Sequence, residues 1–384
     1  MTPPKSGPLT LVEVKSTAEL NRFIAVASAV NAGDPRWIPP LITERQGALS
    51  AKTNPFFDHA QVQLWLAVRD GRDVGRISAQ IDALAPVDPK RPAGHFGLIA
   101  AEDDPEVFAL LLQTAEAWLK ARGCAVAMGP FNLSVNEEVG LLVDGFDTPP
   151  MVMMGHDPAY AGPRIEAQGY AKAKDVYAYI ASLKTDDLPP AALRRLKRGP
   201  GPGVTLRMLD MKCYDAEVAT LTEILNDAWA DNWGFTPTTE AETAQLAKAM
   251  RPVIDPRLVW FTEIDGESAG VVVALPNLNE AIADLGGRLA PFGWAKLLWR
   301  LKVARVKTLR VPLMGVRRKF GAMMRGQLLP FQMMDAVANQ GRALGYEHVE
   351  FSWILEDNAP MRRISEATGG RIYKTYRIYE KALA

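Results

Sequence analysis

The stretch from Lys307 to Tyr379 constrains the fold more than any other feature of the chain. An apolar strand pattern over 308–316 leads into a basic turn, and a long helical pattern follows to about Leu344. A second strand pattern covers 347–354, and then a short helix, a Gly-Gly stop and a last strand complete the segment. A strand that enters a helix through a tight turn points free backbone N–H groups and the positive end of the helix at one spot. The turn is therefore a candidate phosphate site.

The order strand, phosphate turn, helix, strand, Asn, helix, Gly-Gly, strand resembles the core of the GNAT superfamily of acyl-CoA N-acyltransferases. In that superfamily the turn reads Arg/Gln-x-x-Gly-x-Gly/Ala and wraps the pyrophosphate of CoA. With Val316 and Phe320 on the apolar positions, Gly321 stands where Arg or Gln is usual, Met324 on the first Gly and Gly326 on the second. Only Gly326 matches, so the resemblance lies in the order of elements more than in the letters.

The resemblance also implies which residues contact the cofactor, an acyl-CoA. Asn358 falls on the Asn that contacts the pantetheine arm, and Ser365 falls where many members have a Tyr that protonates the leaving thiolate. A backbone N–H near Leu313 or Met314 would hold the oxyanion where two strands diverge. The expected cofactor contacts are Met314, Val316, Arg317, Arg318, Lys319, Gly321, Arg325, Gly326, Asn358 and Arg362. A solvated basic patch is the competing interpretation of the charged members.

Length and composition bound the class of protein. A chain of 384 residues with 48% hydrophobic content favours two domains. A formal net charge of zero gives no bulk attraction to nucleic acid. Cys124 and Cys213 are far apart and show no ligand spacing, so no disulfide framework and no metal site is expected. The sequence shows neither a signal-peptide-like apolar run nor a membrane span, and a cytoplasmic protein is expected.

The element pattern of the first half parallels that of the second, so the fold expected is α/β (mixed α+β). Two tandem GNAT-like domains, each a mixed sheet flanked by helices, would cover residues 1–198 and 199–384. Between them lie Pro189-Pro190, a basic helical turn and the run Gly199-Pro-Gly-Pro-Gly203, whose composition sustains neither helix nor sheet.

Charge predicts which half binds the cofactor. At the strand-to-helix turn of the first half, Glu102, Asp103, Asp104 and Glu106 would satisfy the helix end and repel a pyrophosphate. The corresponding turn of the second half is basic. The second domain is therefore expected to bind acyl-CoA, and the first to be structural or to shape the acceptor pocket.

A basic aromatic insertion at 289–305 stands between two expected strands, where a simple acetyltransferase needs only a turn. No acidic residue occurs between Asp284 and Asp335, while eleven basic residues do. Aromatic and leucine side chains interleaved with cations are typical of a helix in the headgroup boundary of an anionic membrane. The alternatives are a core helix with a solvated face and a lining of an internal lipid pocket.

Acyl transfer to an amine needs a base, because an ammonium ion has no lone pair with which to attack a thioester. Many GNAT enzymes have a Glu on the strand before the phosphate turn, but this chain has Arg310 there. The side chains considered for catalysis are Glu137, Glu138, Asp227, Glu350 and His156. For each of them a cap, a surface charge or another structural role is the alternative.

Two phrases, 353–361 and 374–381, together with the tandem plan and the insertion, resemble the bacterial ceramide synthase group within the superfamily. That resemblance implies transfer of a fatty acyl group from long-chain acyl-CoA to the amine of a long-chain sphingoid base, 3-oxosphinganine or sphinganine. It is compatible with peripheral contact with the inner face of the cytoplasmic membrane. A transferase for a soluble amine and a non-catalytic lipid-binding protein of the same fold are the alternatives.

Overall fold

The computed structural model describes residues 7–184, 187, 190, 201–304 and 306–383. The chain forms two compact units. Unit 1 comprises Met1–Asp175, Ala283–Leu289 and Thr375–Ala384, and unit 2 comprises Val176–Ile282 and Ala290–Lys374. The domain boundary expected at 198/199 and its basic helical turn lie within 191–200, outside the described residues.

The first half of the chain forms the elements of unit 1 and one strand shared with unit 2. They are β1 (Leu9–Glu13), α1 (Thr17–Val30), α2 (Ile42–Ala48), β2 (Ala60–Arg69), β3 (Arg72–Asp82), β4 (Ala93–Ala101), α3 (Pro105–Lys120), β5 (Val126–Gly129), β6 (Phe131–Asn132), β7 (Glu138–Val139), β8 (Leu141–Asp144), α4 (Ala161–Glu166) and β9 (Ala171–Ser182). Helix α1 begins after Ser16, because Ser16 and Glu19 form a reciprocal capping box.

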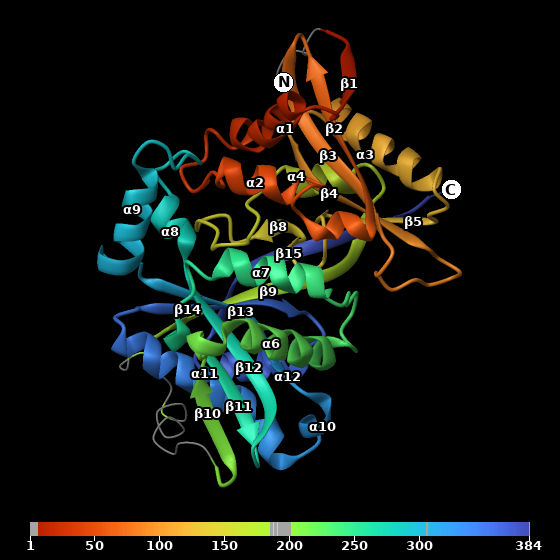
Figure 1. Ribbon diagram of the computed structural model, residues 1–384. Helices are drawn as coiled ribbons and strands as arrows, with labels where there is room; N and C mark the ends of the chain where they lie inside the picture. Colours follow the sequence, from red (N-terminus) through yellow and green to blue (C-terminus); the bar gives the residue numbers. More distant parts are fainter. Residues whose placement is uncertain (1–6, 185–186, 188–189, 191–200, 305, 384) are drawn as a thin grey trace. The chain divides into compact units, whose positions relative to one another are not determined.

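The second half follows the same plan with more helix (Figure 1). Its elements are β10 (Val204–Met208), α6 (Tyr214–Trp229), α7 (Glu240–Met250), β11 (Val259–Ile264), β12 (Glu267–Pro276), α8 (Leu278–Ile282), α9 (Gly293–Trp299), β13 (Thr308–Val316), α10 (Arg318–Gly321), α11 (Met324–Ala343), β14 (His348–Leu355), α12 (Ala359–Ala367) and β15 (Arg371–Ala382). Strand β13 has the expected bounds, and α11 ends one residue before the expected stop.

The two units have the same sheet order. In unit 1 the order is β1-β2-β3-β4-β5-β15, and in unit 2 it is β10-β11-β12-β13-β14-β9. Neighbouring strands are antiparallel except at one step in each unit, β4 to β5 and β13 to β14. The strand beyond each parallel step comes from the other half of the chain, because β15 pairs with β5 and β9 pairs with β14. No sequence pattern indicated this exchange of strands.

Each sheet is covered by helices on both faces, as its strand alternation requires. In unit 1, Leu66 on β2 packs with α1, while its neighbour Trp65 packs with α3. In unit 2, Leu309 on β13 packs with α11, while Val273 on β12 packs with α6. Mixed sheets flanked by helices confirm the expected fold class. Within the part of the chain that the structure describes, no helix has the length and apolarity needed to cross a membrane.

Candidate active site

Strands β13 and β14 of unit 2 diverge partway along their length. Their parallel pairing begins at Thr308 and ends with the pair Val311–Phe351. Beyond that pair, β13 stays bonded to β12 as far as Val316, while β14 stays bonded to β9 as far as Leu355. The two strands therefore follow different neighbours, and an edge of β13 opens between them.

Local irregularities explain the divergence. Between Arg310 and Leu313, β13 has one residue more than the facing part of β12, and between Phe351 and Ile354, β14 has one residue more than β9. An extra residue bends a strand and ends regular pairing. Pro312 adds to the effect, because it has no N–H to donate. Residues 308–311 of β13 are buried, whereas 312–314 are partly exposed.

A buried ion pair lies just before the opening. Arg310 and Glu350 face each other in the register of β13 and β14, and the guanidinium Nε lies 3.3 Å from Glu350 Oε2. Arg310 Nη2 donates a hydrogen bond to Ser352 Oγ at 3.0 Å, and the guanidinium carbon lies 5.3 Å from the ring centre of Trp353. Arg310 thus ties the last paired residues of β13 to the part of β14 that turns away.

Burial controls the protonation of Glu350. The side chain has no exposed surface, and this desolvation raises the pKa of Glu350 to about 7, although Arg310 acts to lower it. A carboxyl group with this pKa exchanges a proton near neutral pH. That property suits a general base.

The bend after β13 leads through the short helix α10 into α11. Gly326, in the first turn of α11, lies so close to α10 that a Cβ would come within 1.9 Å of the Phe320 carbonyl oxygen. Helix α11 has no side-chain cap, so the first-turn N–H groups at Met324, Arg325 and Gly326 have no acceptor from a capping residue. Met324 is 81% exposed. Close packing against Phe320 therefore requires glycine at position 326, the position that matches the turn motif.

The cations of this bend already have carboxylate partners. Arg325 makes two hydrogen bonds to Asp265, at 3.0 and 2.9 Å, and Lys319 pairs with Glu267. Arg317 lies 3.3 Å from Glu223, and Arg318 lies 3.2 Å from Asp231. The excess positive charge seen in the sequence is therefore largely balanced by acids from α6, from the loop that follows it and from the β11–β12 hairpin.

The remaining expected cofactor residues of unit 2 also have defined surroundings. Asn358 caps α12 by accepting a hydrogen bond from Met361 N at 3.2 Å. Arg362 donates to Glu356 O and to Tyr179 Oη, so it fastens α12 to β9. The backbone carbonyl of Met314 accepts a hydrogen bond from the indole of Trp229 at 3.2 Å. Val316 packs with the α11 side of the core, and a Cβ added at Gly321 would meet nothing within 4 Å.

Three of the five side chains considered for catalysis are held by hydrogen bonds or ion pairs, and a fourth interacts electrostatically with an arginine. Asp227 accepts the N–H of Arg318 at 2.7 Å and so caps α10. Glu138 binds Arg45 and Asn132, both at 2.8 Å. The carboxylate of the partly buried Glu137 acts on Arg45 and helps to raise the pKa of that guanidinium. The remaining one, buried His156, has Nε2 2.9 Å from Asp34 Oδ2.

In unit 1 the space beside β4 is filled by the chain itself. Strand β4 has the same extra residue as β13, and the shared register places Gly97 at the position of Arg310. Gln80 donates hydrogen bonds to the carbonyls of Phe131 and Leu133, and Leu98 N donates to Asn132 Oδ1 at 2.7 Å. A Cβ on Gly97 would lie 1.7 Å from Phe131 O. Residues 131–133 therefore occupy the place that is open in unit 2.

The N-terminus of α3, the helix that follows β4, already has a carboxylate bound to one of its N–H groups. Asp104 caps α3 by accepting the N–H of Glu106 at 2.9 Å, and Arg69 pairs with both carboxylates. Of the four acidic residues expected at this helix end, Asp104 caps it, whereas Glu102 pairs with Arg72 and Asp103 with Arg164.

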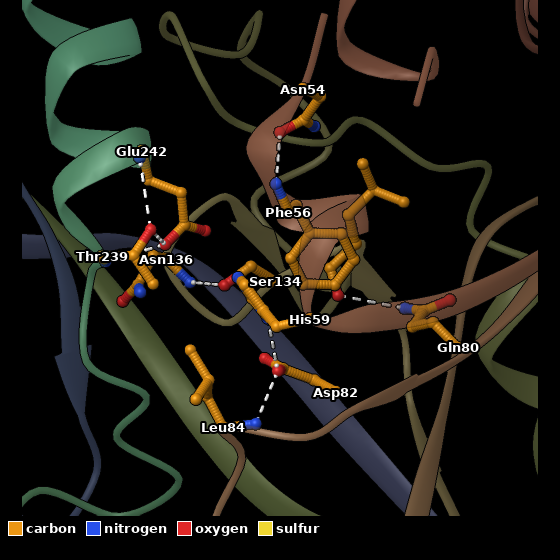
Figure 2. Close-up of polar contacts among 11 residues, drawn as sticks. Asn54, Phe56, His59, Gln80, Asp82, Leu84, Ser134, Asn136, Thr239 and Glu242 are labelled. Atoms are coloured by element: carbon orange, nitrogen blue, oxygen red, sulfur yellow. Dashed lines mark hydrogen bonds and ion pairs between the residues drawn. The ribbon is translucent and has the colours of Figure 1, made fainter. Parts of the chain in front are cut away.

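Sequence reasoning missed two arrangements. It noted Arg310 only as a departure from the family pattern, because its pairing with Glu350 depends on the register of two strands 40 residues apart. The second arrangement is a contact between His59 and Asp82. His59 Nδ1 lies 2.8 Å from Asp82 Oδ1, which also accepts the N–H of Leu84 (Figure 2). The residues give no local signal for either contact.

Solved structures with the same arrangement are GNAT proteins, although no family model matches the chain. A tandem GNAT protein from the clavulanic acid biosynthesis pathway aligns with 98% of this chain and 99% of its own, with a TM-score of 0.57 and 12% identity. A GCN5-related N-acetyltransferase from Sphaerobacter thermophilus aligns with 98% of this chain and 97% of its own, with a TM-score of 0.51 and 14% identity. A glucosamine N-acetyltransferase region of a fungal multi-domain enzyme gives a TM-score of 0.59 at 12% identity, and this chain spans 38% of that protein. The fold is that of a tandem GNAT protein.

Two relatives match along almost their whole length. A protein of Caulobacter vibrioides named bacterial ceramide synthase is 66% identical over 376 residues, which is 98% of each chain. Protein YghO of Escherichia coli is 44% identical over 95% of this chain and 93% of its own. The chain belongs to the bacterial ceramide synthase family, and the resemblance found in the sequence is confirmed.

Proposed function

We propose that this protein is an N-acyltransferase that moves a fatty acyl group from acyl-CoA to the amine of a long-chain sphingoid base, 3-oxosphinganine or sphinganine, to make a (keto)ceramide. The observation that carries the proposal is 66% identity over 98% of the chain to a relative named for that activity. The divergence of β13 and β14 just beyond a buried carboxylate, together with the uncapped end of α11, supports it.

Unit 2 is the half to which we assign acyl-CoA. The diphosphate would lie at the first turn of α11, where backbone N–H groups and the helix dipole favour an anion. Arg317, Arg318, Lys319 and Arg325 would exchange exposed carboxylate partners for phosphate, which costs little because exposed ion pairs contribute little. The acyl-pantetheine arm would follow the open edge of β13. In unit 1 the corresponding edge is covered by residues 131–133.

Glu350 is the side chain to which we assign the role of base. Its carboxylate would take a proton from the ammonium group of the acceptor, which reaches it from the opening one pair further along the strands. The neutral nitrogen then attacks the thioester carbonyl carbon. An N–C bond forms, the C–S bond breaks, and the second proton of the nitrogen passes to sulfur, so that CoA leaves as the free thiol.

The two substrates also imply a location. Long-chain amines and fatty acyl chains partition into bilayers, so we propose that the protein works in the cytoplasm in peripheral contact with the inner face of the membrane.

Turnover by the purified chain in detergent or lipid tests the function. We expect release of CoA thiol only when a long-chain acyl-CoA and a long-chain amine are both present. Calorimetric titration should give one acyl-CoA per chain, with affinity that rises with acyl length. Equal turnover with a soluble short-chain amine would favour the soluble-amine alternative. Bound lipid without any affinity for acyl-CoA would favour the non-catalytic one.

A pair of variants tests the phosphate contact at Arg325. Arg325→Gln should weaken acyl-CoA binding by roughly tenfold if this side chain binds phosphate. Asp265→Asn should strengthen it by about twofold or more, because Arg325 loses its competing partner. Asn tolerates the positive φ of 51° at position 265. A purely structural ion pair predicts the same sign for both variants, so titration of each with one acyl-CoA decides the question.

A further inference from the structure

Residues 290–304, called here the aromatic segment, place their apolar side chains on the surface. Phe292 is 76% exposed, Val303 65%, and Trp294 and Trp299 each 56%. None of the residues of α9, or of the π-helical turn Arg300–Ala304 that continues it, is buried. The structure therefore excludes the core-helix interpretation for these described residues.

A hydrogen bond connects the aromatic segment to helix α8. Arg300 Nη1 donates to Ala281 O on α8 at 2.8 Å, which fixes the segment beside that helix (Figure 1). The indole N–H of Trp294 is bonded to Pro291 O at 3.1 Å within the segment itself. Because its polar atom is already satisfied, this ring can enter an apolar medium without leaving a donor unpaired.

The exposed apolar side chains are accompanied by charge of one sign. Lys296 and Lys302 are exposed among them, and the sequence has no acidic residue from 285 to 334. The apolar positions also do not form one stripe. Trp294 and Leu298 share one side of the helix, while Phe292 and Trp299 share another. A bilayer surface that carries anionic lipids accepts exposed apolar side chains next to cations and disfavours carboxylates, and the segment meets both conditions.

We propose that the aromatic segment docks this protein on a bilayer surface that carries anionic phospholipids. The aromatic and aliphatic side chains enter the headgroup boundary, and the lysines contact the lipid phosphates. This inference adds a binding surface to the proposed function. It rests on that function in one respect, because the long-chain acceptor resides in a lipid bilayer.

Vesicle binding by the full chain tests the proposal. With vesicles of phosphatidylglycerol and phosphatidylcholine at about 3:7, flotation should show binding that falls as salt is added. Trp294→Ser/Trp299→Ser should lower the partition coefficient at least tenfold. Lys296→Gln/Lys302→Gln should reduce binding to the level seen with phosphatidylcholine alone.

A matched control separates docking from general surface apolarity. Val303→Ser and Val87→Ser make the same change at valines that are 65% and 67% exposed. We expect severalfold weaker binding for the first and wild-type binding for the second. Unchanged vesicle binding in the tryptophan variant, equal loss at Val87, or a change of oligomeric state in gel filtration in place of a loss of binding would overturn the proposal.

The vesicle assay contains no acyl-CoA, so its outcome is separate from turnover. Docking without CoA release would reject the proposed function and leave the membrane surface in place. Release in detergent without docking would reject only the membrane surface.

Discussion

Glu350→Gln should lower kcat/KM for acyl transfer by about a hundred- to a thousandfold, the usual contribution of a general base. Burial raises the pKa of Glu350 to about 7, so the wild-type rate should fall as the pH drops below that value and the carboxylate takes up its proton. This fall in rate at low pH, the acidic limb of the pH profile, should be absent from the variant. Thiol release measured from pH 5.5 to 8.5, with acyl-CoA binding measured beside it, gives both results.

Two further variants make the result specific. Glu347→Gln is the same change at a partly exposed carboxylate just before β14. Glu347 pairs with Lys307, and the change should leave the rate and the pH profile unaltered. Arg310→Met removes a cation that lowers the pKa of Glu350, so the acidic limb should move to higher pH. If Glu350→Gln keeps wild-type activity with its acidic limb intact, the base lies elsewhere.

Stability gives an independent measure of the same group. The folded protein holds a proton on Glu350 up to about pH 7, whereas the unfolded chain releases it near 4.5. The folded state therefore binds more protons in that window, and the contribution of Glu350 to the free energy of unfolding falls as the pH rises through it. This slope should be absent from the melting temperatures of Glu350→Gln.

Gly326→Ala should abolish tight acyl-CoA binding and destabilise the fold by about 1–3 kcal/mol, the cost of overpacking. The new Cβ would lie 1.9 Å from the Phe320 carbonyl oxygen, so α10 and the first turn of α11 must separate. The N–H groups to which we assign the diphosphate would then lose their arrangement. Calorimetric titration with acyl-CoA and thermal unfolding measure the two effects.

Gly47→Ala is the control for Gly326→Ala. Gly47 is also helical, in α2 of unit 1, but nothing lies within 4 Å of its added Cβ. We expect unchanged binding and equal or higher stability, because Ala is the better helix former. Unaltered acyl-CoA affinity in a folded Gly326→Ala protein would remove the bend from the binding site.

The sequence by itself determined the elements and their order. Local signals were sufficient where the cause is local: the Ser16 capping box starts α1, the apolar run 308–316 forms β13, and Gly345 follows the end of α11. The order of strands and helices, which is a property of the chain, also pointed to the correct fold and family. Gly326 was identified from its place in the turn pattern.

Only the tertiary structure decided which charges act and which are neutralised. The basic residues near 317–325 looked available in the sequence, but Asp265, Glu267 and acids on α6 approach them through the fold. The Arg310–Glu350 pair requires the register of two parallel strands, and the closing of unit 1 by residues 131–133 requires a loop to return to β4. These contacts join residues far apart in the chain, so packing determines them and local propensity does not.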